Sequence, residues 1–269
     1  MPTPGQPELS VIFVSYRSAG LLERSLRSLC PTLQASEGSI EVIIVGNDPE
    51  ERERLEALSG IFPVSVIVAT ENLGFGAAAN RAAGQASGEF LLFLNPDTEH
   101  LHGSFDLPLR FLRSHPEVGV LGARLVDGFG NPEPWSVGYP ANLLRILIGK
   151  LKPSFLRKYW EYDYAVSVGW VSGGALFVRS ALFRDLGGFD EGFFLYFEDM
   201  DFCIRSRKRG YRTVFHPGIS FLHRGGASFR SHEEQKSAYY GAQDRYFNKH
   251  RPGWEAALLR RLRSRIMMV

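Results

Sequence analysis

Short apolar runs rich in β-branched residues alternate with helical patterns through the first half of the chain. The apolar runs predict four strands, at residues 9–14, 41–45, 64–68 and 90–94. Three helices are predicted between them, at residues 19–33, 49–58 and 74–86. Continuously apolar strands that alternate with helices indicate an α/β fold, with a mostly parallel central sheet flanked by helices on both faces.

The second half of the chain is less regular, because glycines and prolines interrupt it and aromatic residues cluster. Residues 142–160 interleave apolar side chains with basic ones, among them Arg145 and Arg157, and the chain ends in the basic sequence RRLRSRIMMV. We expect a single α/β domain over residues 1–250 and a basic amphipathic helical extension over residues 251–269.

Composition narrows the functional classes. The 31 basic and 29 acidic residues nearly balance, which argues against a dedicated nucleic-acid binder. The two cysteines, Cys30 and Cys203, form no CxxC pair, so a disulfide scaffold or a thiolate zinc site is not expected. The first ten residues lack the pattern of a signal peptide, and no apolar run approaches the roughly 18 residues that a membrane span requires. We expect a cytoplasmic protein that is soluble or bound to the inner face of the membrane.

Polar side chains follow three of the predicted strands, where each strand ends. They are Ser15, Tyr16 and Arg17 after the first, Asn47 and Asp48 after the second, and Asn95, Pro96 and Asp97 after the fourth. In open parallel sheets, ligands bind beyond the carboxyl ends of the strands. These residues therefore predict a binding site at one edge of the sheet.

The chain also contains a series of motifs in a defined order. They are VIFVSYRSAGLLERSLRSL, EVIIVGNDPE, ENLGFGAAANRA, EFLLFLNPDTE, GGFDEGFFLYFEDMDFCIRSRKRGY and FLHRGGAS. The series resembles the family 2 glycosyltransferases of GT-A fold, and within them the bacterial rhamnosyltransferase-like branch. The resemblance covers residues 9–247, nearly the whole chain.

The resemblance implies an inverting, metal-dependent enzyme that moves a sugar from a nucleotide diphosphate to an acceptor hydroxyl. Residues 1–98 would bind the donor, a dTDP- or UDP-sugar with dTDP-L-rhamnose as the most specific expectation. Residues 99–250 would bind the acceptor, a glycan or lipid-linked glycan in bacterial surface polysaccharide assembly.

A divalent cation, Mg²⁺ or Mn²⁺, is expected to neutralise the leaving diphosphate. Asp97 lies at the family's DxD position and would hold this cation, although Asn95 replaces the first aspartate of that motif. His223 matches a histidine that reaches the metal or the diphosphate in the resembling enzymes. An Asn-Pro-Asp turn and a structural histidine are the ordinary alternatives.

Glu198 and Asp199 are the candidates for the base that removes the acceptor proton. The family's base matches Asp199, with Glu198 in reserve, and the surrounding aromatic residues should raise the pKa of the carboxylate against the opposing helix dipole. Asp201 is assigned a supporting role in acceptor binding; a helix-surface ion pair with Arg205 is the alternative.

The donor base is expected at Ser15, Tyr16, Arg17, Asn47 and Asp48, although Gly46 stands where the family usually has an aspartate. The glycine-rich loop at Gly74 would let the backbone approach the nucleotide, with Asn72 and Asn80 fixing the loop or touching ribose and phosphate. A structural cap is the alternative for Asn80. The loop imitates a dinucleotide-binding fingerprint, but it follows the third strand, where that fingerprint does not belong.

Three further residues, Trp170, Gly173 and Gly174, would bind the acceptor sugar, with a bulged strand as the alternative. The basic stretch 142–160 and the tail could contact an anionic membrane; a homodimer interface or a solvated surface are the alternatives. Because Gly46 and Asn95 each replace a carboxylate, a catalytically inactive nucleotide- or glycan-binding homologue is the second functional hypothesis.

Overall fold

The computed structural model describes residues 6–134, 136–151, 156–225 and 232–266. One large sheet dominates it, with strand order β3-β2-β1-β4-β10-β6-β11-β5 and with β8 also paired to β11. The first four strands along the chain are β1 (Leu9–Ser15), β2 (Ile40–Gly46), β3 (Val64–Val68) and β4 (Phe90–Leu94). They pair in parallel with one another and coincide with the predicted strands to within one residue at each end.

The remaining strands come from the second half of the chain. They are β5 (Thr98–His102), β6 (Val118–Val126), β8 (Val166–Val168), β10 (Ala175–Arg179) and β11 (Arg212–His223). Strand β10 runs antiparallel to both of its neighbours, β4 and β6, while β11 runs parallel to β6. The reversal at β10 places the start of this strand beside the end of β4, so residues before β10 reach the edge where the parallel strands end.

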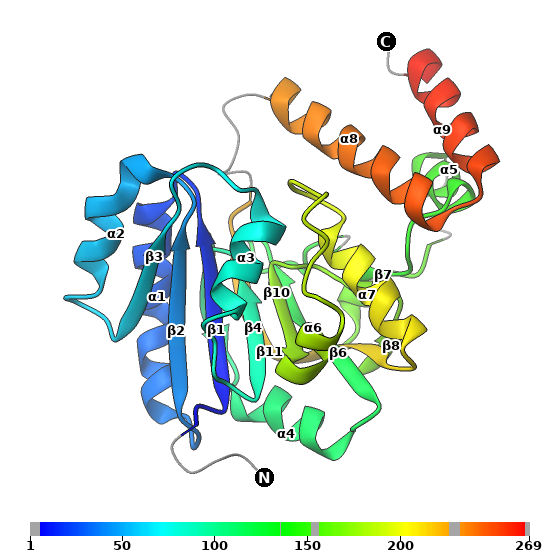
Figure 1. Cartoon of the computed structure of the whole chain (residues 1–269). Coiled ribbons are helices and arrows are strands. Elements are labelled where there is room, and N and C mark those ends of the chain that lie inside the picture. The colour runs from blue at the N-terminus through cyan, green and yellow to red at the C-terminus, as the bar shows by residue number, and fades with distance from the viewer. Residues whose placement is uncertain (1–5, 135, 152–155, 226–231, 267–269) are drawn as a thin grey trace.

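Helices cover both faces of the sheet, as predicted (Figure 1). One face packs against α1 (Ala19–Ala35), α2 (Arg52–Leu58) and α4 (Asp106–Ser114). The other packs against α3 (Phe75–Ala83), α6 (Ser180–Asp185) and α7 (Glu198–Lys208). The predicted helix 74–86 is shorter in the structure, because Gly74 has a φ of 79° and stands before the helix, and the helix ends at Gly84.

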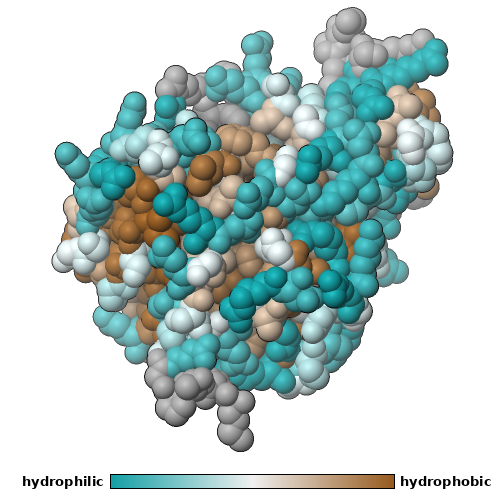
Figure 2. All heavy atoms as spheres, viewed as in Figure 1, coloured by the Kyte–Doolittle hydropathy of each residue, from teal (hydrophilic) through white to brown (hydrophobic). Residues whose placement is uncertain are grey.

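A third apolar cluster joins the C-terminal elements to the start of α7. Helices α5 (Leu143–Leu151), α8 (His232–His250) and α9 (Gly253–Ile266) lie beyond one end of the sheet (Figure 1). Leu143, Tyr246, Phe247 and Leu259 are buried there together with Phe197. The visible face of α8 is mainly hydrophilic (Figure 2). Residues 152–155 of the predicted basic stretch and 267–269 of the tail lie outside the described residues.

Among the described residues, no helix is both long and apolar enough to span a membrane.

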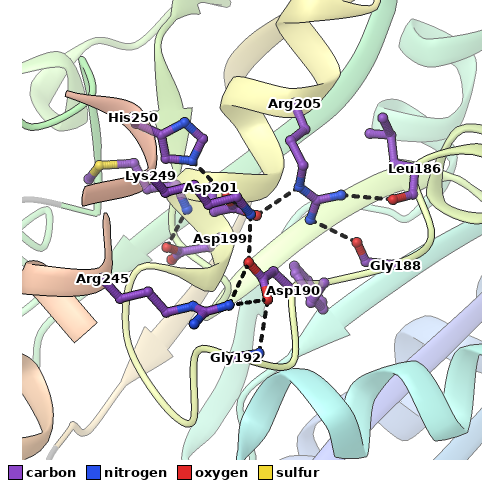
Figure 3. Close-up of polar contacts among 12 residues, drawn as sticks. Leu186, Gly188, Asp190, Gly192, Asp199, Asp201, Arg205, Arg245, Lys249 and His250 are labelled. Atoms are coloured by element: carbon purple, nitrogen blue, oxygen red, sulfur yellow. Dashed lines mark hydrogen bonds and ion pairs between the residues drawn. The ribbon is translucent and has the colours of Figure 1, made fainter. Parts of the chain in front are cut away.

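A buried ionic cluster fixes α7 to α8. The Asp201 carboxylate on α7 has no exposed surface and contacts Arg205 at 2.7 Å, Lys249 at 2.6 Å and His250 at 2.7 Å (Figure 3). Lys249 also contacts Asp190, in the loop that precedes α7, at 2.6 Å. Burial alone would raise the pKa of Asp201, but the bonds from His250, Lys249 and Arg205 outweigh it and lower that pKa to about 2.

We predict that Asp201→Asn lowers the free energy of unfolding by about 3 kcal/mol, because the variant leaves buried cations without their counter-charge. The folded-state pKa of Asp201 lies below the unfolded value of about 3.9. Its stabilisation is therefore present above pH ~4 and is lost as the pH falls toward 2. Denaturant unfolding at pH 7 and pH 3 measures both effects.

Asp185→Asn is the matched control, because Asp185 pairs with Arg209 at 3.3 Å with both side chains more than half exposed. Equal losses in the two variants would contradict a special role for the buried cluster.

Candidate active site

The last residue of β11 meets the turn after β4, although more than a hundred residues separate them. His223 pairs with Thr98 in the β11–β5 ladder, and the Arg224 N–H donates to the Asp97 carbonyl at 3.1 Å. On the other side of β4, the Asn95 N–H donates to the Gly174 carbonyl at 3.1 Å. These two connections bring Asn95, Asp97, Gly174 and His223 together at one sheet edge.

His223 lies between two carboxylates. Its Nδ1 is 2.8 Å from Glu133 Oε2, and its Nε2 is 3.4 Å from Asp97 Oδ1 and 3.2 Å from the Asn95 amide nitrogen. Burial would lower the pKa of His223, but the hydrogen bonds to Asp97 and Glu133 outweigh it and raise that pKa to about 10. Without a bound cation the imidazole is therefore protonated at neutral pH, and a metal ion that binds Nε2 would displace the proton there.

Within the described residues, no three histidine, cysteine, aspartate or glutamate side chains are grouped to hold a metal ion unaided. Asp97 and His223 nevertheless supply one carboxylate and one imidazole at the same point, and this donor pair is suited to Mn²⁺. Glu133 accepts from the other imidazole nitrogen, an arrangement that commonly orients a metal-binding histidine. The donor set thus fits a cation whose other ligands come from a bound molecule.

Asp199 occupies the first turn of α7, with both carboxylate oxygens bonded to the backbone. Oδ2 accepts from Gly173 N–H at 2.9 Å and Oδ1 accepts from Met200 N–H at 2.6 Å. Burial raises the pKa of Asp199 to about 6, against the lowering effect of these backbone hydrogen bonds. The direction agrees with the shift expected from the sequence.

The chain enters α7 through two consecutive left-handed residues. Tyr196 has a φ of 72° and Phe197 a φ of 67°, conformations that cost non-glycine residues roughly 1–2 kcal/mol each. Strain of this kind persists only where the surroundings enforce it, and it clusters at functional sites. Here it turns the chain so that Asp199 faces Gly173.

Glu198, the neighbouring candidate, lies in a different environment. Its side chain is buried, and its Oε2 atom has no hydrogen-bond partner among the described residues. Burial, and then the nearby Asp199 charge, raise the pKa of Glu198 well above its ordinary value. The shift favours the neutral form of Glu198.

On the predicted donor side, Asn47 organises the glycine-rich loop. Its amide donates to the Asn72 side chain at 2.9 Å and to the Gly74 carbonyl at 3.1 Å, and its oxygen accepts from Leu73 N–H. Gly74 has a φ of 79°, and a Cβ there would lie 2.4 Å from the Phe194 carbonyl oxygen. This glycine therefore lets the loop pack against the segment that leads to α7.

The residues after β1 and β2 contact one another. Arg17 Nε donates to Asp48 Oδ2 at 3.0 Å, and Ser15 bonds to Ser18. A Cβ at Gly46 would lie 2.5 Å from Leu55 Cδ1, so a side chain there would require Leu55 to move. Tyr16 lies beside the Arg17 guanidinium, 5.0 Å from ring centroid to Cζ.

Two predicted site residues make structural contacts away from this edge. Asn80 donates to the Phe189 carbonyl at 2.9 Å and accepts from the Phe189 N–H at 2.8 Å, as its structural alternative proposed. Asp201 does pair with Arg205, but not at the surface. Its carboxylate is buried in the cluster with Arg205, Lys249 and His250. It also does not line the cavity described next.

A cavity of about 1180 Å³ opens beside Asp199. Asn95, Trp170, Gly173, Gly174 and His223 line it. The Trp170 indole N–H donates to the Tyr139 carbonyl at 3.1 Å. Residues 170–179 contain two strands, β9 (Trp170–Val171), which pairs with β7 (Val137–Gly138), and β10. The glycines lie in the break between the two strands, where Gly173 reaches Asp199.

Sequence reasoning missed Glu133, which contacts His223 across a loop. The surrounding sequence GNPEPW reads as an ordinary turn, so only the fold reveals this carboxylate. Arg145 and Arg157 belong to the basic stretch. In the fold they line the same cavity as Asp199, which the sequence does not indicate.

We predict that NMR of the protein in the presence of a chelator finds His223 protonated on both ring nitrogens at pH 8. Its folded pKa of about 10 exceeds the unfolded value of about 6.5, so its stabilisation is complete below pH ~6.5 and is lost as the pH rises through 10. Glu133→Gln should lower the pKa of His223. His216, whose pKa burial lowers, is the internal control. A neutral His223 at pH 8 would contradict this arrangement.

Comparison with known proteins identifies the family. Residues 10–182 match the model of glycosyl transferase family 2. The chain is 31% identical, over 94% of its length and 88% of the relative, to N-acetylglucosaminyl-diphospho-decaprenol L-rhamnosyltransferase of Mycobacterium tuberculosis. It is 26% identical to the rhamnosyltransferase WbbL of Escherichia coli over 51% of this chain and 53% of that protein.

Solved structures share the fold at low sequence identity. Staphylococcus aureus TarS (residues 1–349) superposes with a TM-score of 0.56 and 18% identity, over 90% of this chain and 72% of that one. A mannosyltransferase from Pyrobaculum calidifontis, in complex with GDP-mannose and Mn²⁺, gives a TM-score of 0.58 and 17% identity over 93% and 66%. The fold is GT-A, and the chain belongs to glycosyl transferase family 2, a family of enzymes that transfer sugars.

Proposed function

We propose that this glycosyltransferase inverts the anomeric configuration as it moves a sugar onto an acceptor hydroxyl, with Asp199 as the general base. The observation that supports the proposal is the position of the Asp199 carboxylate. It lines the cavity, is held by two backbone N–H groups, and lies at the sheet edge that also contains Asp97 and His223.

The pKa of about 6 suits Asp199 to proton transfer. Above that pH the carboxylate is ionised and can accept a proton, while it remains a stronger base than an exposed aspartate. As the acceptor oxygen attacks the anomeric carbon, its proton passes to Asp199. The raised pKa of Glu198 favours its neutral form, which cannot accept this proton.

The donor is proposed to be a pyrimidine nucleotide sugar, with dTDP-L-rhamnose the first choice because the named relatives transfer rhamnose. Asp97 and His223 would hold the divalent cation, which offsets the charge of the leaving diphosphate. Ser15, Tyr16, Arg17, Asp48, Asn72 and the Gly74 loop would bind the nucleoside. The acceptor is a glycan or lipid-linked glycan in polysaccharide assembly, with transfer at the cytoplasmic face of the membrane.

We expect kcat/KM to rise tenfold per pH unit below pH 6 and to level off above it, as Asp199 becomes ionised. Asp199→Asn should reduce kcat by about 10²–10⁴-fold, the usual contribution of a general base, and leave donor binding intact. Initial rates of transfer at several pH values measure both.

Glu198→Gln is the matched control, because the amide has the size of the neutral carboxylic acid that the raised pKa of Glu198 favours. This variant should keep most of kcat. If Glu198→Gln reduces kcat as much as Asp199→Asn does, the assignment of Asp199 rather than Glu198 as the general base is contradicted.

Thermal-shift binding across a panel of nucleotide sugars tests the donor site. The preferred donor at 100 times its Kd should stabilise the protein by about 2.7 kcal/mol. That stabilisation should require Mn²⁺ or Mg²⁺. In the Asp97→Asn variant, the donor should no longer stabilise the protein, with or without the cation. Donor binding without transfer to any acceptor would favour the inactive, ligand-binding homologue instead.

A further inference from the structure

The cavity beside Asp199 is larger than an acceptor sugar needs. Its volume of about 1180 Å³ exceeds the roughly 300–1,000 Å³ of sites for drug-sized molecules. Tyr16, Arg17, Asp48 and Asn72, on the predicted donor side, do not line it. The cavity therefore extends away from those residues, from Asn95 and His223 past Asp199 to α5.

One wall of this cavity is apolar and comes from α5 and the segment 156–160. Leu144, Ile148, Leu156 and Trp160 line it. Leu144 is 65% exposed and leaves apolar surface open at the rim of the cavity. Figure 1 shows α5 beyond the end of the sheet, next to α9. This wall suits a hydrocarbon chain better than a sugar.

Two arginines lie in the same wall. Arg145 stacks on Tyr139 with its Cζ 4.4 Å from the ring centroid, and Arg157 lies beside the Tyr159 hydroxyl. Among the described residues, neither arginine forms an ion pair with a carboxylate, in contrast to Arg205, Arg251 and Arg263. Both guanidinium groups are therefore available to an anion within the cavity.

The carboxylates that line the cavity have other partners or a raised pKa. Glu133 bonds to His223, Asp199 bonds to Gly173 and Met200, and burial raises the pKa of Glu198 well above its ordinary value. Among the described residues, none of these carboxylates pairs with Arg145 or Arg157. Guanidinium groups bind phosphate oxygens strongly, because their planar fork matches two oxygens at once.

We propose that α5 and residues 156–160 form the subsite for a lipid diphosphate, with Arg145 and Arg157 on the diphosphate and Leu144, Ile148 and Leu156 along the first part of the lipid. This inference rests on the proposed function and assigns the acceptor a chemical class: a sugar joined through a diphosphate to an apolar chain. With the diphosphate held by α5, the attached sugar extends toward Trp170 and Asp199.

Farnesyl diphosphate is the test ligand, because it carries both parts without a sugar. Trp160 and Trp170 line the cavity, so tryptophan fluorescence reports binding. Arg145→Ala/Arg157→Ala should weaken farnesyl diphosphate binding about 10- to 100-fold and leave UDP binding unchanged. Leu144→Ser, at an exposed position, should weaken farnesyl diphosphate binding but not binding of inorganic diphosphate.

Arg110→Ala is the matched control, since Arg110 is exposed on α4 and does not line the cavity. Equal affinity of the double variant and the wild type for farnesyl diphosphate would overturn the inference. So would complete displacement of farnesyl diphosphate by UDP, which would place its diphosphate in the donor site. Arg145-dependent binding of phosphatidylglycerol vesicles without binding of farnesyl diphosphate would also overturn it, in favour of a membrane contact.

The experiments distinguish failure of the lipid-diphosphate subsite from failure of the proposed glycosyltransferase function. If the double variant still transfers sugar to a short acceptor without a diphosphate, with unchanged kcat and KM, the transferase stands whichever way the lipid test falls. If the wild type binds no nucleotide sugar, the proposed function fails first. Thermal unfolding of each variant checks that it remains folded.

Discussion

The hydrogen bond from the Gly173 N–H to the Asp199 carboxylate ties a helix to the edge of the sheet, and the geometry of the site follows from it. Gly173 immediately precedes the part of the chain that enters β10, the strand that reverses direction beside β4. Because of that reversal, the start of β10 and the end of β4 share one edge. The bond therefore places Asp199 at the edge where Asn95, Asp97 and His223 already meet.

Two aspartates in the first turn of α7 show how local surroundings divide their roles. Asp199 is partly buried with only backbone N–H groups as partners, so desolvation prevails and its pKa rises to about 6. Asp201 is also buried, but His250, Lys249 and Arg205 donate to it and its pKa falls to about 2. The first is suited to exchanging a proton near neutral pH. The second remains charged and anchors α7 to α8, which stabilises the strained entry at Tyr196 and Phe197.

Much of the first half of the fold could be predicted from periodicity, because its buried parallel strands are continuous apolar runs. The strands at residues 64–68 and 90–94 were predicted to the residue. The order of the sheet could not be predicted, since nothing local in residues 175–179 indicates that β10 lies beside β4. Asp201 illustrates the same limit: its spacing from Arg205 indicates a surface pair, and only the packing of α8 makes it a buried cluster.

Some site residues can be recognised in the sequence, and others only in the fold. Asp97, Asp199 and His223 stand in motifs, so the sequence indicates them, and the fold brings Asp97 and His223 into contact. Glu133 and the pair Arg145 and Arg157 belong to no motif. They become recognisable only when a loop and a helix from the irregular part of the chain close over the cavity.

The anomeric configuration of the product tests the central claim most directly. With the preferred donor and an acceptor that the enzyme accepts, NMR of the purified product gives the configuration at the new glycosidic bond. If Asp199 acts as a base for direct displacement, the product has the configuration opposite to that of the donor. A product with the donor's configuration would contradict the account, because it would require a different reaction path at the anomeric carbon.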